Sequence, residues 1–180
     1  AIFIEILPAT VGLWTKASPG TAPAEAVAGA MSLLLLGYLS IQFFEHTLAP
    51  HFHFGAETHP ESFMKPSAAY TAVGGLWIHT FFDGVSIASA FLVNFNVGVL
   101  VFIAILLHKM PEGFTVASIM LASGRSSRTA LIATAAIGAA TLAGVIGVTL
   151  LDARMGDAVS YALPFSAGVT LYVAASDLIP

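Results

Sequence analysis

The sequence predicts an all-α integral membrane protein, a polytopic bundle of transmembrane helices. Hydrophobic residues make up 57% of the 180 residues and charged residues only 9%, whereas a soluble domain carries roughly 25% charged residues. Such a chain cannot cover its own surface in water, so lipid must surround most of it. The chain has no cysteine, which excludes disulfides and thiolate metal sites, and its net charge of -4 offers no basic field for nucleic acid.

Five stretches are apolar over the roughly 20 residues that a membrane span requires, and no stretch has the alternating pattern of a membrane barrel. Residues 1–7 are interpreted as the end of a sixth span, which stops at Pro8. Because both ends of the chain look cut, we expect further helices on either side. Together the spans form a single transmembrane domain over residues 1–180, with full spans at 27–45, 68–93, 97–122, 129–151 and 159–179.

The connections between the spans differ in character. Residues 8–26, with three Pro and two Gly, are expected to form a polar loop, and residues 46–67 form a longer loop that holds four of the six His. The residues Asn94 to Asn96 predict a tight turn, and 152–157 predict a short, mostly acidic loop. Lys and Arg are slightly more frequent on the side of the 46–67 loop, so the positive-inside rule places that loop in the cytoplasm.

Helix 129–151 is predicted to have a packing role. It carries no charge, and the small residues Ala136, Ala140 and Gly144 recur every four positions. Such a stripe lets a neighbouring helix approach closely.

Two predicted helices carry ionisable residues at membrane depth. Helix 68–93 contains His79 and Asp83; helix 97–122 contains His108 and Glu112. In each six-residue motif, or hexad, a His is followed four positions later by a carboxylate and then by Gly. Residues four apart lie on one helix face, and a tight turn joins the two helices, so we expect the hexads to face each other.

The side chains of the two hexads are typical metal ligands. Two imidazoles and two carboxylates suit Zn²⁺, and also Fe²⁺, Mn²⁺, Co²⁺ or Cd²⁺. Ionisable groups in a bilayer are costly unless they pair or bind a cation, so the hexads predict a divalent metal site.

Further polar groups extend these two faces. Ser86 follows Asp83 by three residues, and Thr115 follows Glu112 by three. This pattern is typical of a path that an ion follows, although a Ser or Thr can instead bond its own helix backbone. Pro111 leaves the carbonyl four residues before it without a helical donor, which favours either a simple kink or a carbonyl that lines a cavity or binds an ion.

Polar residues outside the helices are candidates for weaker roles. The loop histidines are expected either to capture metal loosely on the cytoplasmic side or to lie in a solvated loop, and they are His46, His51, His53 and His59. Two carboxylates near the membrane edge, Glu5 and Asp177, either guide ions at an entrance or lie in water.

The paired hexads, with Pro before Glu in the second, resemble the fourth and fifth helices of the Zrt/Irt-like (ZIP) metal transporters. Residues 5–8 are similar to the end of the family's second helix, the histidine loop to its variable cytoplasmic loop, and 166–168 with 176–180 to its seventh helix. The chain would then extend from the end of helix two to helix seven of an eight-helix fold.

The resemblance implies a transporter, not an enzyme, in a cellular membrane, with the cell membrane expected. It would carry Zn²⁺, or Fe²⁺, Mn²⁺ or Cd²⁺, into the cytoplasm by alternating access. Its partners would be divalent metal ions and lipid, a homodimer is compatible with it, and no nucleic acid is expected. The implied transport site consists of His79, Asp83, His108 and Glu112.

The sequence departs from the family at the second metal position. The residue after the first His is often Asn and here is Thr80. The residue after the leading position of the second hexad is often Asp or Glu and here is Lys109. Because the Lys109 ammonium would lie where a second cation would bind, we expect a mononuclear site in which Lys109 substitutes for the missing ion.

Two alternatives remain at this point. A cation diffusion facilitator also uses intramembrane His-x-x-x-Asp pairs and would export metal, although the Pro-Glu-Gly run and the placement of the hexads on consecutive helices argue against it. An intramembrane metallohydrolase needs an open metal position and a separate general base, and both hexads already use their carboxylates as expected ligands.

Overall fold

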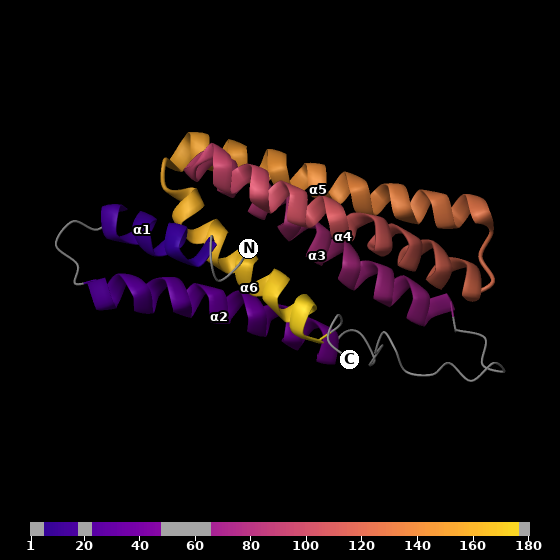
Figure 1. The fold of residues 1–180 in the computed structure, drawn as a ribbon. Coiled ribbons are helices and arrows are strands. Elements are labelled where there is room, and N and C mark those ends of the chain that lie inside the picture. The colour runs from indigo at the N-terminus through magenta and orange to yellow at the C-terminus, as the bar shows by residue number, and fades with distance from the viewer. Residues whose placement is uncertain (1–5, 18–22, 48–65, 177–180) are drawn as a thin grey trace.

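The computed structural model describes residues 6–17, 23–47 and 66–176, and within these ranges the regular structure is entirely helical. The helices lie side by side in an elongated bundle (Figure 1). In chain order they are α1 (Leu7–Ala17), α2 (Pro23–Thr47), α3 (Pro66–Val93), α4 (Phe95–Ala122), α5 (Ser127–Met155) and α6 (Ala158–Ser176).

Four of the described helices, α2 to α5, are long and apolar enough to cross a membrane. The apolar part of α6 is shorter, at Ala158–Val173. Large apolar side chains such as Leu107, Phe114 and Leu131 point outward from the bundle, as expected where lipid is the solvent. The predicted fold class, a polytopic helical membrane protein, is confirmed.

The predicted polar loop at 8–26 is wrong at both ends, because residues 8–17 belong to α1 and residues 23–26 belong to α2. Helix α1 runs from Leu7 to Ala17, so Pro8 lies in its first turn and does not stop a helix there. A proline is tolerated at that position because the first N–H groups of a helix have no intrahelical acceptor. Ala9 and Leu13 pack against a buried cluster and hold α1 on the bundle.

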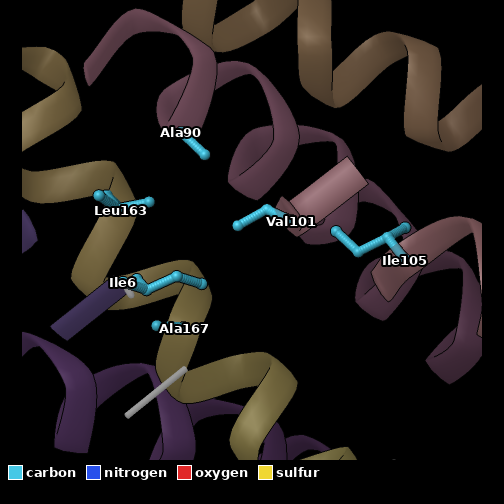
Figure 2. Packing of buried hydrophobic residues seen from close by; sticks show 6 residues of the cluster. All are labelled: Ile6, Ala90, Val101, Ile105, Leu163 and Ala167. Carbon is cyan, nitrogen blue, oxygen red and sulfur yellow. The ribbon is translucent and has the colours of Figure 1, made fainter. Parts of the chain in front are cut away.

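Helix α3 lies between α5, α4 and α6, whereas α2 packs mainly on α6 and α1. One core cluster joins these groups: Ala90 of α3 and Val101 of α4 pack with Leu163 and Ala167 of α6 and with Ile6 (Figure 2). The helix that carries the first hexad therefore packs against three other helices, α4, α5 and α6.

Helices α3 and α5 approach so closely that their backbones touch at two glycines. A Cβ atom at Gly84 would lie 1.9 Å from the Thr141 carbonyl oxygen, and one at Gly144 would lie 2.0 Å from the Phe81 carbonyl oxygen. Both positions therefore require glycine. The predicted small-residue stripe on α5 needs one correction: Ala140 and Gly144 are buried, but Ala136 is exposed, and the buried face continues through Ile137 instead.

A proline inside α6 is compensated from α1. Pro164 has no N–H, so the Ser160 carbonyl lacks its helical donor. The indole Nε1 of Trp14 donates to this carbonyl over 2.8 Å, and the Trp14 ring packs edge-on against Tyr161. Trp14 thereby connects α1 to α6 through the Ser160 carbonyl, which Pro164 leaves without a helical donor.

The turns set the order of the helices. Asn94 alone separates α3 from α4, and its side chain accepts hydrogen bonds from the backbone N–H groups of Asn96 and Val97, as an N-cap does. The expected tight turn is confirmed. The predicted 152–157 loop is mostly helical, because α5 continues to Met155 and ends at Gly156, whose φ of 75° is the left-handed conformation that favours glycine.

Candidate metal site

The two hexads meet between α3 and α4. Because Asn94 reverses the chain in a single residue, α3 and α4 run antiparallel. His79 and His108 lie at nearly equal separations on either side of Asn94, so they are at the same depth. Their rings are 6.0 Å apart between centroids. The hexads thus face each other, as their spacing predicts.

Three nitrogen atoms surround one oxygen of Asp83, which is fully buried. Lys109 Nζ donates to Asp83 Oδ2 over 2.7 Å, His108 Nε2 lies 3.2 Å from the same oxygen, and His79 Nε2 lies 3.5 Å from it. The other oxygen of this carboxylate, Asp83 Oδ1, has no partner among the described residues. A buried carboxylate with one free oxygen is prepared to accept a cation.

His79, Asp83 and His108 can together hold a metal ion. Each offers one ligand atom, and the three ligand atoms lie within 4.8 Å of one another. Two imidazole nitrogens and one carboxylate oxygen form a donor set that suits zinc and similar transition metals.

The second nitrogen of His108 shows how this ring is oriented. His108 Nδ1 lies 3.1 Å from the Ala104 carbonyl oxygen, and since a carbonyl only accepts, Nδ1 must carry the hydrogen. Nε2 then faces the Asp83 carboxylate with either a second proton or a metal ion between them. A backbone carbonyl that fixes the far nitrogen of a ligating histidine is common in metal sites.

Glu112 is held apart from the three-residue group. Its Oε1 accepts a hydrogen bond from Thr80 Oγ1 over 2.6 Å, and its Oε2 accepts one from Lys109 Nζ over 2.7 Å. Both oxygens are therefore occupied by protein donors, and Glu112 is not within ligand distance of the other three residues. Thr80 and Lys109, which the sequence marked as departures from the family pattern, are the two residues that hold it.

The two predicted path residues differ. Ser86 is buried, and its hydroxyl has no hydrogen-bond partner among the described residues. Thr115 is half-buried, and its hydroxyl donates to the Pro111 carbonyl over 3.0 Å. Thr115 therefore satisfies its own helix backbone, which is the alternative interpretation of such residues.

The structure adds polar residues that sequence reasoning missed. Ser89 is buried, its hydroxyl has no partner within the described ranges, and the signal for it was its position three residues after Ser86. On α5, which the sequence assigned to packing alone, Thr134 and Thr141 line a cavity of about 330 Å³ that reaches Lys109 and Glu112. No regular spacing linked them to the hexads.

Several predicted residues lie outside the described part of the chain. The backbone of His46 belongs to the last turn of α2, so the predicted 46–67 loop starts slightly later than expected. The remaining candidates fall in segments whose placement is not described: Glu5, His51, His53, His59 and Asp177.

Fold and site together define a class: a polytopic helical membrane protein in which paired hexads on antiparallel helices meet as a candidate metal site. The comparison with protein families gives the same result, because residues 57–180 match the model of the ZIP zinc transporter family. The chain belongs to this family.

Several relatives to which the chain is similar are named as zinc transporters. The chain is 30% identical to zinc transporter ZIP9 of Micropogonias undulatus over 82% of this chain and 49% of that protein. It is 32% identical to zinc transporter zipt-7.2 of Caenorhabditis elegans over 62% of this chain and 25% of that protein. It is 35% identical to the zinc transporter ZIP13 homolog of Drosophila melanogaster over 64% of this chain and 34% of that protein. The chain thus spans half or less of the length of these relatives, and no solved structure matches it.

Proposed function

We propose that this chain forms the ion-binding core of a transporter that carries divalent transition-metal ions, Zn²⁺ first among them, across a membrane and into the cytoplasm. The observation that carries the proposal is the convergence of His79, Asp83 and His108 within 4.8 Å at the interior of a membrane bundle. Ionisable groups at such depth mark ion pathways, because burying them without a cargo or a partner is costly.

The donor set supports zinc over alkaline-earth ions. Ca²⁺ and Mg²⁺ prefer six or more oxygen ligands or a shell of waters. Two imidazole nitrogens beside one carboxylate suit Zn²⁺, and also Fe²⁺, Mn²⁺ and Cd²⁺ with different strengths. The relatives named as zinc transporters point to the same ion.

The site is proposed to hold one ion at a time, with Lys109 in place of a second. The Lys109 ammonium lies 2.7 Å from an oxygen of Asp83 and 2.7 Å from an oxygen of Glu112. It therefore supplies the positive charge that a second metal would otherwise supply between the two carboxylates.

Glu112 is proposed as the fourth ligand once an ion has entered. It is held at present by Thr80 and Lys109. The positive charge of an ion bound to His79, Asp83 and His108 would repel the Lys109 ammonium and attract the Glu112 carboxylate, so that a rotation of the Glu112 side chain could bring one oxygen to the metal. In this proposal Thr80 and Lys109 hold Glu112 away from the metal position until an ion binds.

Transport is proposed to occur by alternating access, in which α3, α4 and α5 move together past α2 and α6. The mutual backbone contacts at Gly84 and Gly144 support treating α3 and α5 as one body. Arg125 and Arg128 near the start of α5 support placing that end, together with the histidine loop, in the cytoplasm. The loop histidines, Glu5 and Asp177 remain candidates for metal capture and entry, and residues 1–180 are proposed to form a single transport domain.

Membership in the ZIP family favours transport over the two alternatives. A cation diffusion facilitator belongs to a different family. A metallohydrolase needs an open metal position and a separate general base, whereas here Glu112 is proposed as the fourth metal ligand.

The test is zinc flux into proteoliposomes that contain the intact protein. Wild type should take up Zn²⁺, and the double substitution His79→Ala with Glu112→Ala should abolish uptake because it removes two of about four ligands. Thr149→Val, on the exposed face of α5, is the control for insertion and should transport normally. Wild-type rates in a well-inserted double variant would refute the assignment.

A further inference from the structure

Two serine hydroxyls in the interior of α3 have no hydrogen-bond partner in the described part of the chain. Ser86 is 2% exposed and Ser89 is 0% exposed, and neither Oγ makes a hydrogen bond to any described residue. A serine inside a helix ordinarily donates to the carbonyl four residues earlier, as Ser32 and Ser40 do in α2. A buried hydroxyl without a partner costs free energy. These two hydroxyls therefore require an explanation.

Both serines extend the line of polar residues on α3 beyond the first hexad, with a rotation of about 60° around the helix axis at each three-residue step. Ser86 lies about one turn beyond Asp83, and Ser89 lies about one turn beyond Ser86, toward the end of α3 at Asn94. Asp83 Oδ1 is also buried and unpaired. Three free oxygen atoms therefore occur on successive turns of one helix, starting at the candidate metal site.

The turns that carry the two serines face α6. The Phe82 ring, one turn before Ser86, lies 5.2 Å from the Phe165 ring between centroids. Ala90, one turn after Ser86, packs with Leu163 and Ala167 (Figure 2). The buried hydroxyl of Ser166 on α6 donates to the Leu163 carbonyl over 3.0 Å. The α3 residues on either side of the two serines thus contact α6, and the Ser166 hydroxyl of α6 donates to its own helix.

We propose that Ser86 and Ser89 line the segment of the ion path between the hexads and the end of α3 at Asn94, a role that rests on the proposed function. Their ligand is a partly hydrated divalent cation with its water. Neutral hydroxyl oxygens hold such an ion less tightly than a carboxylate does, so the ion passes and does not stop there. The contact with α6 closes the segment in this structure, and the segment fills with water when α3 and α6 separate.

Cysteine accessibility tests this inference without requiring transport as the readout. The 180 residues contain no cysteine, so with any cysteine elsewhere in the protein replaced by serine, Ser89→Cys introduces a unique and nearly isosteric thiol. The matched control is Ala90→Cys, because Ala90 is equally buried but packs in an apolar cluster. In proteoliposomes, a small cationic methanethiosulfonate reagent should modify Cys at 89 several-fold faster than Cys at 90. Equal rates at the two positions overturn the inference.

Zinc flux in the same preparations distinguishes a failure of the proposed path from a failure of the proposed function. Wild-type flux together with equal labelling at 89 and 90 overturns the path and leaves the proposed function standing. Absence of flux in well-inserted wild type overturns the proposed function and the path with it. A second variant, Ser89→Ala, should slow zinc flux while leaving equilibrium zinc affinity at the hexads unchanged. Unchanged flux in Ser89→Ala contradicts a role in the path, and so does reduced affinity, which would indicate a structural effect on the site.

Discussion

Lys109 Nζ lies 2.7 Å from Asp83 Oδ2, so an amine from one hexad neutralises the carboxylate of the other. The same nitrogen is 2.7 Å from Glu112 Oε2. One side chain therefore links both carboxylates of the candidate site. It is 20% exposed, and His108 beside it is 32% exposed, whereas Asp83 is fully buried. The partly open flank of the site is thus formed by α4.

This relationship predicts how Lys109→Met behaves. Methionine keeps much of the side-chain length but removes the charge, which leaves two adjacent carboxylates without a cation. Breaking a buried ion pair in this way costs about 3–5 kcal/mol. The variant should therefore be less stable than wild type without metal, and Zn²⁺ should raise its melting temperature by more than it raises that of wild type, because the ion replaces the missing charge. Thermal unfolding in detergent with and without Zn²⁺ measures both effects. If Zn²⁺ raises the melting temperature equally in the two proteins, Lys109 does not take the place of a second ion.

The two hexad glycines are predicted to differ. A Cβ at Gly84 would meet the Thr141 carbonyl oxygen at 1.9 Å, and this backbone atom cannot move aside, whereas a Cβ at Gly113 would lie 3.5 Å from the Thr134 methyl group. Gly84→Ala should therefore push α3 away from α5 and destabilise the protein by more than the roughly 1–3 kcal/mol typical of overpacking. Gly113→Ala should be neutral or stabilising by up to about 1 kcal/mol, because alanine favours helix. Melting temperatures of the two variants provide the test, and similar losses in both would contradict the close α3–α5 contact.

The Trp14 hydrogen bond is predicted to matter only because Pro164 frees a carbonyl. Trp14→Phe keeps an aromatic ring but loses the N–H, which leaves the Ser160 carbonyl unpaired at a cost of roughly 1–3 kcal/mol. Pro164→Ala restores a backbone donor to the same carbonyl. The loss caused by Trp14→Phe should therefore be smaller in the Pro164→Ala background, and a double-mutant cycle of unfolding free energies measures the difference. Additive effects would show that Trp14 acts through packing alone.

The meeting of the hexads could be predicted from the sequence because two simple regularities fix it. Residues four apart share a helix face, and the turn at Asn94 makes α3 and α4 antiparallel neighbours. The existence of the five longest helices followed from apolar runs of sufficient length. Helix α1 could not be predicted, since Pro8 is both a helix breaker and a good first-turn residue, and only the packing of Ala9 and Leu13 decides between the two.

The hydrogen-bond partner of each hydroxyl also could not be predicted from the sequence. The hydroxyl of any Ser or Thr within a helix can either donate a hydrogen bond to its own helix backbone or face a group on another helix. The Thr115 hydroxyl donates to its own helix backbone, the Thr80 hydroxyl donates to Glu112, and the Ser86 hydroxyl has no partner among the described residues. These outcomes depend on distances between helices that no spacing in the chain encodes. For the same reason, the retention of Glu112 by Thr80 and Lys109 could not be foreseen from four residues that look equivalent as ligands.

We propose that a single divalent ion binds to His79, Asp83 and His108 between α3 and α4. X-ray absorption at the zinc edge, on protein loaded with Zn²⁺ after the loop histidines His46, His51, His53 and His59 are replaced, measures it most directly. We expect one zinc per chain, with two imidazole nitrogens at about 2.0 Å and oxygen in the remaining positions, and loss of this signal in His79→Ala. Two zinc ions per chain, or an imidazole signal that persists in His79→Ala, would contradict it.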